Sequence, residues 1–127
     1  MPERRYKGYR VYVYIALARL FASLDLDLSA PELMTQVPDA LAHPTGRVSK
    51  EEILHAIRSN SHMTEKVLAH LIAEGFATME KDELGYDIRI TFAGVDHLRR
   101  FRQFYRELYA RELSEHYRYT GSPRWLG

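Results

Sequence analysis

The sequence predicts a mainly helical α+β domain in which a β-hairpin separates the central helices from a long C-terminal helix. Three observations support this prediction. Two segments begin with the capping pattern of a helix N-terminus, residues 86–92 alternate apolar and polar side chains as a strand does, and a long amphipathic segment follows them. The chain of 127 residues is the size of one domain, so we expect a single domain over residues 1–127.

The first predicted helix, within residues 1–28, spans residues 9–24 and is apolar almost all round. Only Tyr12, Arg19 and Ser23 share a narrow polar arc, so this helix must be covered on two faces. One small domain can supply one cover, and we expect a second subunit to supply the other. The apolar run is shorter than the roughly 20 residues of a membrane span, and no secretory signal precedes it. We therefore expect a soluble, cytoplasmic protein.

The next segment, Ser29-Ala-Pro-Glu32, has the pattern of a helix start, with Ser29 as the cap and Glu32 three residues later. We expect this helix to be short, because Val37 precedes Pro38 and the residue before a proline disfavours helix. Residues 38–46 are then predicted to form a loop.

A second capping box, Ser49-Lys-Glu-Glu52, predicts another helix, which ends at a turn over residues 59–61. A third helix is predicted from about residue 62 to residue 74, and Gly75 occupies the position of a helix-ending glycine. These helices and the strands after them make up a predicted core over residues 29–92.

Two strands, residues 76–81 and 86–92, are predicted to form a β-hairpin, because the connection 82–85 is short and contains glycine. Residues 93–119 are then predicted to form a long amphipathic helix, followed by an irregular tail over residues 120–127.

Charge is distributed unevenly along the chain. Residues 1–28 carry a net charge of +2, residues 29–92 a net charge of −4 and residues 93–127 a net charge of +3. A basic start and a basic end therefore flank an acidic centre, although the whole chain has a net charge of +1. Binding of nucleic acid by the centre would need help from the ends.

The order of the predicted elements is that of a winged helix-turn-helix domain. The junction Val67-Leu-Ala-His-Leu-Ile-Ala-Glu-Gly-Phe76 resembles the end of the recognition helix in MarR- and PadR-like transcriptional regulators. After the hairpin, Arg89-Ile-Thr-Phe-Ala-Gly94 is similar to the Leu-Thr-x-x-Gly step by which those families enter their dimerisation helix. The resemblance spans roughly residues 48–110. It implies a dimeric DNA-binding regulator that pairs through its first and last helices.

The residues themselves also favour a homodimer, because the first and last helices offer more apolar surface than one small core can bury. The alternative is that these helices pack on each other within one chain. We expect the following residues in the dimer interface: Val11, Tyr14, Ile15, Leu98, Phe101, Tyr105, Leu108, Tyr109 and Glu112. Glu112 and His116 lie one helical turn apart and could pair across the dimer axis, which would make association sensitive to pH.

The resemblance makes residues 61–74 the recognition helix and residues 76–92 the wing, and duplex DNA the expected partner. The predicted DNA contacts are Lys50, Asn60, Ser61, His62, Thr64, Glu65, Lys66, His70, Lys81 and Arg89. Because the recognition helix is neutral and the wing acidic, two alternatives stay open. One is a winged-helix assembly or adaptor module that binds protein. The other is an architectural DNA binder whose Arg-rich last helix makes the contacts.

Eight of the nine tyrosines lie near the two ends of the chain, among arginines. They could stack on the bases of single strands, but interface residues are the favoured interpretation.

The sequence gives no support for an enzyme or for a bound cofactor. The chain has no cysteine, and its six histidines show no HExxH spacing, so no metal site is predicted. Nucleotide-binding glycine motifs and the G-x-S-x-G motif are absent as well. The family resemblance allows a small-molecule effector, in a pocket lined by Tyr14, Phe21, Phe101 and Tyr105.

Overall fold

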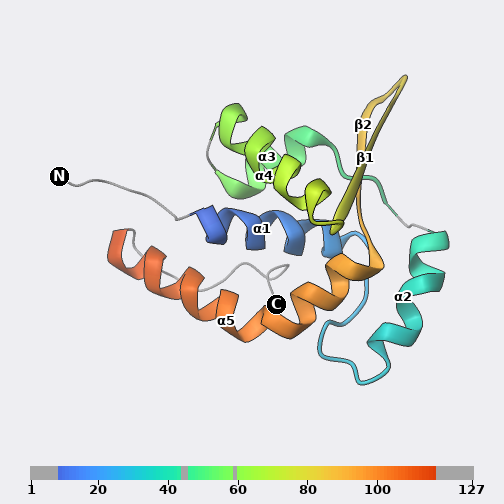
Figure 1. The fold of residues 1–127 in the computed structure, drawn as a ribbon, viewed down its shortest axis with the longest axis horizontal. Coiled ribbons are helices and arrows are strands. Elements are labelled where there is room, and N and C mark those ends of the chain that lie inside the picture. Colours follow the sequence, from blue (N-terminus) through green and yellow to red (C-terminus); the bar gives the residue numbers. More distant parts are fainter. Residues whose placement is uncertain (1–8, 44–45, 59, 117–127) are drawn as a thin grey trace.

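The structure is a computed structural model that describes residues 9–43, 46–58 and 60–116, without the side chains of residue 109 and residues 112–116. The described chain is mainly helical with one antiparallel hairpin, as predicted (Figure 1). Its elements are α1 (Tyr9–Ala22), α2 (Leu33–Ala42), α3 (Lys50–Ile57), α4 (Ser61–Ala73), β1 (Ala77–Asp82), β2 (Gly85–Ile90) and α5 (Phe92–His116). The predicted tail, residues 120–127, lies outside the described residues.

Helix α1 lies at the centre of the molecule, with α3 and α4 on one side and α5 on the other (Figure 1). Every residue from 11 to 18 is buried, as are Leu20 and Phe21. One chain therefore covers both faces of this helix, and the expectation that a second subunit must supply one cover is wrong. The helical wheel predicts that two covers are needed, but it carries no information on which elements provide them.

The polar arc of α1 contacts the first turn of α3. Arg19 lies 2.7 Å from Glu52 Oε2. The other oxygen of Glu52 accepts a hydrogen bond from the Ser49 backbone N–H at 3.1 Å, and Ser49 Oγ accepts one from the Glu52 N–H at 3.2 Å. The predicted capping box is thus confirmed, and one carboxylate both caps α3 and joins it to α1.

The start of α2 differs from the prediction. Ser29 donates through its backbone N–H and its hydroxyl to Asp27 Oδ1, at 3.0 and 2.7 Å, instead of capping a helix. Helix α2 begins at Leu33 and continues through Pro38 to Ala42. The predicted loop from residue 38 is therefore wrong over residues 38–42. Leu33 and Val37, one turn apart, are both fully buried, and this burial offsets the backbone hydrogen bond that proline cannot donate.

Helices α3 and α4 are joined by a short turn at the predicted place. The backbone of Arg58 is left-handed, with φ 57°, and this residue ends α3. Asn60 then caps α4. The short turn sets α3 and α4 at an angle to each other. Both helices pack on α1.

The hairpin is also close to the prediction, with Lys81 opposite Tyr86 and Met79 opposite Ile88. Val48 adds an isolated antiparallel bridge to Ile88, whose N–H donates to the Val48 carbonyl at 3.0 Å. The segment that precedes α3 is therefore held along the edge of the hairpin. The tip of the hairpin extends beyond α3 and α4 (Figure 1).

Helix α5 is tied to the end of α4 at its first turn. The Thr91 hydroxyl donates to the Gly75 carbonyl at 2.6 Å and accepts from the Gly94 N–H at 3.0 Å. A Cβ at Gly94 would lie 2.3 Å from the Phe76 carbonyl oxygen, so only glycine fits here. Among the described residues, no helix has the length and apolar character required to cross a membrane.

Candidate nucleic-acid interface

One side of α4 faces away from the molecule and carries small and polar side chains. Its exposed residues recur at three- and four-residue spacing, which places them in one strip along the helix. This strip, called the α4 strip below, consists of Ser61, His62, Glu65, Lys66 and Ala69. All four polar members were predicted DNA contacts, and the structure brings them together on one surface.

Two further predicted contacts have structural roles at the start of α4. Thr64 is 3% exposed, and its hydroxyl donates to the Asn60 carbonyl at 3.0 Å. The prediction that Thr64 contacts DNA is therefore wrong, because this side chain lies on the core side of the helix. Asn60 is exposed, but its Oδ1 accepts a hydrogen bond from the Met63 N–H at 2.8 Å and caps the helix.

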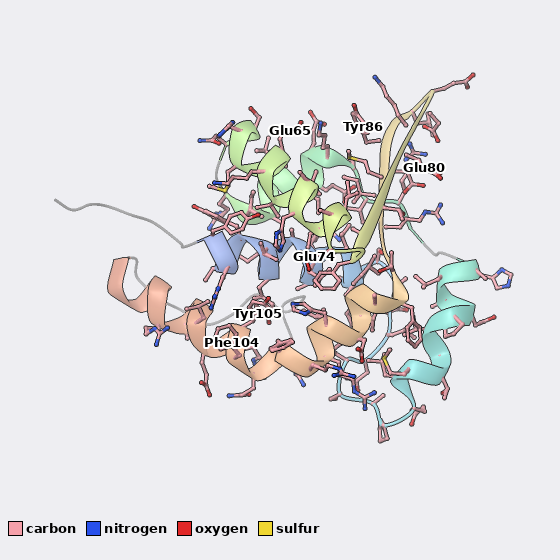
Figure 2. All side chains as sticks on the ribbon, in the orientation of Figure 1. Glu65, Glu74, Glu80, Tyr86, Phe104 and Tyr105 are labelled. Atoms are coloured by element: carbon pink, nitrogen blue, oxygen red, sulfur yellow. The ribbon has the colours of Figure 1, made fainter. Side chains whose placement is uncertain are left out.

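A cluster of two lysines and a tyrosine borders one flank of the α4 strip. Lys50 Nζ lies 4.5 Å from the centroid of the Tyr86 ring, and Lys81 Nζ lies 5.4 Å from it. Both distances are within the range of a cation–π interaction. Lys50 also forms an ion pair with Glu65 of the strip. This wing cluster (Lys50, Lys81 and Tyr86) joins α3, α4 and the hairpin, and Glu65 and Tyr86 lie on the same side of the molecule (Figure 2).

A second tyrosine borders the opposite flank. Lys66 Nζ lies 5.3 Å from the centroid of the Tyr9 ring, and the Tyr9 hydroxyl donates to the Lys66 carbonyl at 3.5 Å. The His70 ring meets Tyr9 edge-on at 5.6 Å. Burial raises the pKa of Tyr9 above its usual value. The chain therefore enters α1 beside the α4 strip, directly after a basic segment containing Arg4, Arg5 and Lys7.

Neither Tyr9 nor Tyr86 was among the predicted contacts. The interleaving of tyrosine with basic residues near the start of the chain is the signal that could have identified Tyr9. No comparable pattern marks Tyr86, because its lysine neighbours come from α3 and from the paired strand.

Two arginines at the hairpin, Arg47 and Arg89, are held in ion pairs. The Arg47 guanidinium donates to both oxygens of Asp82, at 2.6 and 2.8 Å, and to the Gly85 carbonyl at 3.0 Å. Arg89, a predicted contact, lies 2.9 Å from Asp87. Three exposed cations of the α3, α4 and hairpin region form no ion pair with another described residue: Arg58, Lys66 and Lys81. These ion pairs leave the net negative charge of residues 29–92 unchanged, so the three remaining cations lie in an acidic region.

Most of the predicted dimer-interface residues lie in the core of one chain. Those between 0 and 9% exposed are Val11, Tyr14, Ile15, Leu98, Tyr105 and Leu108. They contact other elements of the same chain and do not form its surface, which corrects the prediction for these six. Phe101 alone among the described members is well exposed, at 46%. The side chains of Tyr109, Glu112 and His116 lie outside the described part.

An aromatic surface nevertheless exists on α5, on the side of the molecule opposite α4. Phe104 is 45% exposed beside Phe101 and meets the Tyr105 ring at 5.5 Å. Figure 2 places Phe104 and Tyr105 on the α5 side, away from Glu65. We call Phe101 and Phe104 the α5 patch.

Beneath the α5 patch, the rings pack closely. His97 stacks on Phe76 with the ring centroids 4.4 Å apart, and its Nε2 lies 2.9 Å from the Tyr105 hydroxyl. Tyr105 in turn stacks on Tyr14 at 5.0 Å. Burial lowers the pKa of His97 and raises that of Tyr105. Tyr14 and Tyr105, two of the four residues predicted to line an effector pocket, thus pack against each other.

The arginines of α5 lie on the helix across α1 from α4 (Figure 1). Arg100 pairs with Asp96 at 3.0 Å. Because α1 separates the two helices, a DNA duplex lying on the α4 strip would not contact the same face as these arginines. The architectural alternative therefore requires a different surface of the molecule.

Over residues 9–43, 46–58 and 60–116, no group of three or more histidine, aspartate or glutamate side chains is placed to hold a metal ion. The comparisons add no assignment: no protein-family model, curated protein or solved structure shows a significant match to this chain.

Proposed function

We propose that this chain is a winged helix-turn-helix protein that binds duplex DNA, with α4 in the major groove and the hairpin as the wing. The observation that supports it best is the α4 strip with a lysine–tyrosine pair on each flank. A helix in the major groove needs polar heads and small residues toward the base edges, and Ser61, His62 and Ala69 meet that need. It also needs cations on both sides, where the two phosphate backbones run.

The flanking cations fit the role of phosphate contacts. Lys66 and Lys81 are exposed, carry no carboxylate partner among the described residues, and are each oriented by a tyrosine ring. Such contacts position a protein on DNA and make its affinity fall steeply with salt. With so few free cations, we expect modest affinity that is measurable at low salt. The basic segment before Tyr9 would add to it.

We further propose that two chains pair through the α5 patch and act as a homodimeric transcriptional regulator. Two exposed phenylalanines side by side on one helix are unusual on a monomer surface and are typical of an interface core. The patch lies across the molecule from the α4 strip, so pairing there would leave both α4 strips accessible. This arrangement agrees with the family resemblance.

A second candidate function, contact with a protein partner, is favoured by the wing tip. Leu84 is 84% exposed at the turn, directly after Asp82 and Glu83. Acidic side chains at this position oppose a phosphate backbone, whereas an exposed leucine beside them suits a basic protein surface.

The test is binding to mixed-sequence duplex DNA, followed by fluorescence anisotropy at several salt concentrations. The variant Lys66→Ala/Lys81→Ala should bind more weakly, and the slope of log affinity against log salt should fall by about 2, one for each phosphate contact. Arg99→Ala/Arg100→Ala on α5 removes the same charge from the opposite side and is the matched control.

An α5 variant that loses affinity while the α4 and wing variant keeps it would support the architectural alternative instead. If the wild-type protein binds no duplex even at low salt, DNA binding is wrong, and the acidic wing tip becomes the surface to test against protein partners.

A further inference from the structure

Glu65 is the carboxylate at the centre of the α4 strip. It lies one helical turn after Ser61 and one turn before Ala69, so small side chains stand on both sides of it along the helix. Its side chain is 57% exposed. A partner that reaches the strip can therefore contact this carboxylate, and the small neighbours allow that partner to approach closely.

The position of the carboxylate is fixed by Lys50. The ion pair uses Glu65 Oε2, and Lys50 is itself held over the Tyr86 ring. Glu65 Oε1 makes no hydrogen bond with another described residue. The pair thus presents one oriented acceptor oxygen on the outer side of α4.

An ionised carboxylate accepts hydrogen bonds and donates none. Facing DNA, it is repelled by the phosphates whatever the base sequence. In the major groove only cytosine N4 and adenine N6 present hydrogen-bond donors. The standard partner of a carboxylate is cytosine N4. Adenine N6 lies beside the acceptor N7, and this donor–acceptor pair is matched by a side-chain amide. The repulsion is compensated only where such a donor faces Glu65.

We propose that Glu65 selects cytosine at one position of the DNA site. This inference rests on the proposed function and adds a base preference to it. Lys50 acts as a positioning residue, because it fixes the carboxylate and partly neutralises it. Glu65 in this role lowers the general affinity of the protein and raises its discrimination between sequences.

The experiment is selection of binding sites from a random duplex library, for the wild-type chain and two variants. The wild-type chain should enrich cytosine at one fixed position by roughly 5- to 150-fold over the other bases, the discrimination of one good base contact. Glu65→Gln carries an amide, which pairs with adenine N6 and N7, so its preference at that position should shift from cytosine to adenine. Glu32→Gln removes the same charge from the exposed residue before α2 and should leave the preference unchanged.

A second probe changes the DNA instead of the protein. Duplexes in which the selected cytosine is replaced by N4-methylcytosine lose a donor hydrogen, and the wild-type preference should fall toward that of the other bases. The same replacement should leave binding by Glu65→Gln nearly unchanged. Equal thermal midpoints for the wild-type chain and Glu65→Gln would show that both are folded alike, as expected for a substitution at an exposed side chain.

Two results would overturn the inference. If Glu65→Gln binds every duplex more tightly with the same base preferences, Glu65 is only a repelling charge. If the wild-type chain binds duplex DNA and depends on Lys66 and Lys81 but shows no cytosine preference, the proposed function survives and this inference fails. Absence of any duplex binding by all three proteins removes both.

Discussion

The guanidinium of Arg47 donates hydrogen bonds to both carboxylate oxygens of Asp82, at 2.6 and 2.8 Å, and so links the segment before α3 to the end of β1. The same carboxylate accepts a hydrogen bond from the Leu84 N–H at the hairpin turn, at 2.9 Å. One exposed aspartate therefore holds both the turn and the neighbouring segment in place.

This arrangement gives a pH dependence with a definite sign. The Arg47 hydrogen bonds, aided by the Leu84 N–H, lower the pKa of Asp82 from 3.8 to about 2. A carboxyl whose pKa is lowered by folding stabilises the fold at pH values above its pKa in the unfolded chain. This contribution is lost as pH falls from about 4 to about 2. Titration by NMR should give Asp82 a pKa near 2, and Arg47→Ala should return it toward 3.8.

The matched control for that titration is Arg99→Ala, which removes an arginine of α5 that does not contribute to the pKa shift of Asp82. An Asp82 pKa that stays near 2 in Arg47→Ala would mean that the guanidinium is not the cause of the shift.

Gly94→Ala should destabilise the protein severely. The added methyl would lie 2.3 Å from the Phe76 carbonyl oxygen and 2.7 Å from Ile90 Cγ1, and a backbone atom cannot move aside as a flexible side chain can. We expect a loss of about 1–3 kcal/mol or more in the free energy of unfolding, measured by urea denaturation. Gly46→Ala, where no atom lies within 4 Å of the new Cβ, is the control and should be nearly neutral. Equal stabilities would contradict the close approach of α5 to Phe76.

His97 should make stability depend on pH in the neutral range. Burial lowers its pKa below 6.5, and the charge of nearby His70 adds to this shift, while Glu74 and Asp96 oppose it. The unfolded chain then takes up a proton more readily than the folded one, so stability is full above about pH 6.5 and falls as pH drops toward the folded pKa.

In His97→Gln, the decrease in unfolding free energy between about pH 7 and pH 5 should become shallower. His43→Gln, at an exposed histidine just after α2, should leave it unchanged. A wild-type stability that is flat over this range would exclude the effect.

Charges placed in the α5 patch should weaken self-association. Phe101→Glu/Phe104→Glu introduces two carboxylates where the exposed rings are expected to meet a second copy. Sedimentation velocity should then show a dissociation constant raised by at least tenfold. Leu84→Glu, at an equally apolar but distant position, is the control. A wild-type chain that is monomeric at all concentrations would refute pairing through α5.

The local elements of this fold could be predicted from the sequence. The capping box at Ser49 and the alternation around Ile88 both depend on residues within a few positions of one another, and the structure places α3, α4 and the hairpin within one or two residues of the prediction. Helix α2 was missed at both ends. Asp27 competes for Ser29, and buried contacts of Leu33 and Val37 carry the helix past Pro38.

The sequence could not predict which helix surfaces pack against one another. The burial of α1 depends on α3, α4 and α5 converging on it, and the side on which Thr64 lies depends on how α4 is rotated against that core. The candidate site shows the same contrast between features set by neighbouring residues and features set by contacts between distant residues. The members of the α4 strip were predicted from their spacing on one helix, whereas Tyr9 and Tyr86 join it through contacts across the chain.

The hydrogen bonds of Thr91 have a mechanical consequence. This hydroxyl bonds the Gly75 carbonyl just after α4 and the Gly94 N–H in the first turn of α5, and the lack of a side chain at Gly94 allows the two segments to approach closely. We therefore expect the end of α4 and the start of α5 to move together. In a dimer joined through α5, a rotation of a few degrees between the subunits would change the separation of the two α4 strips directly, without bending either chain.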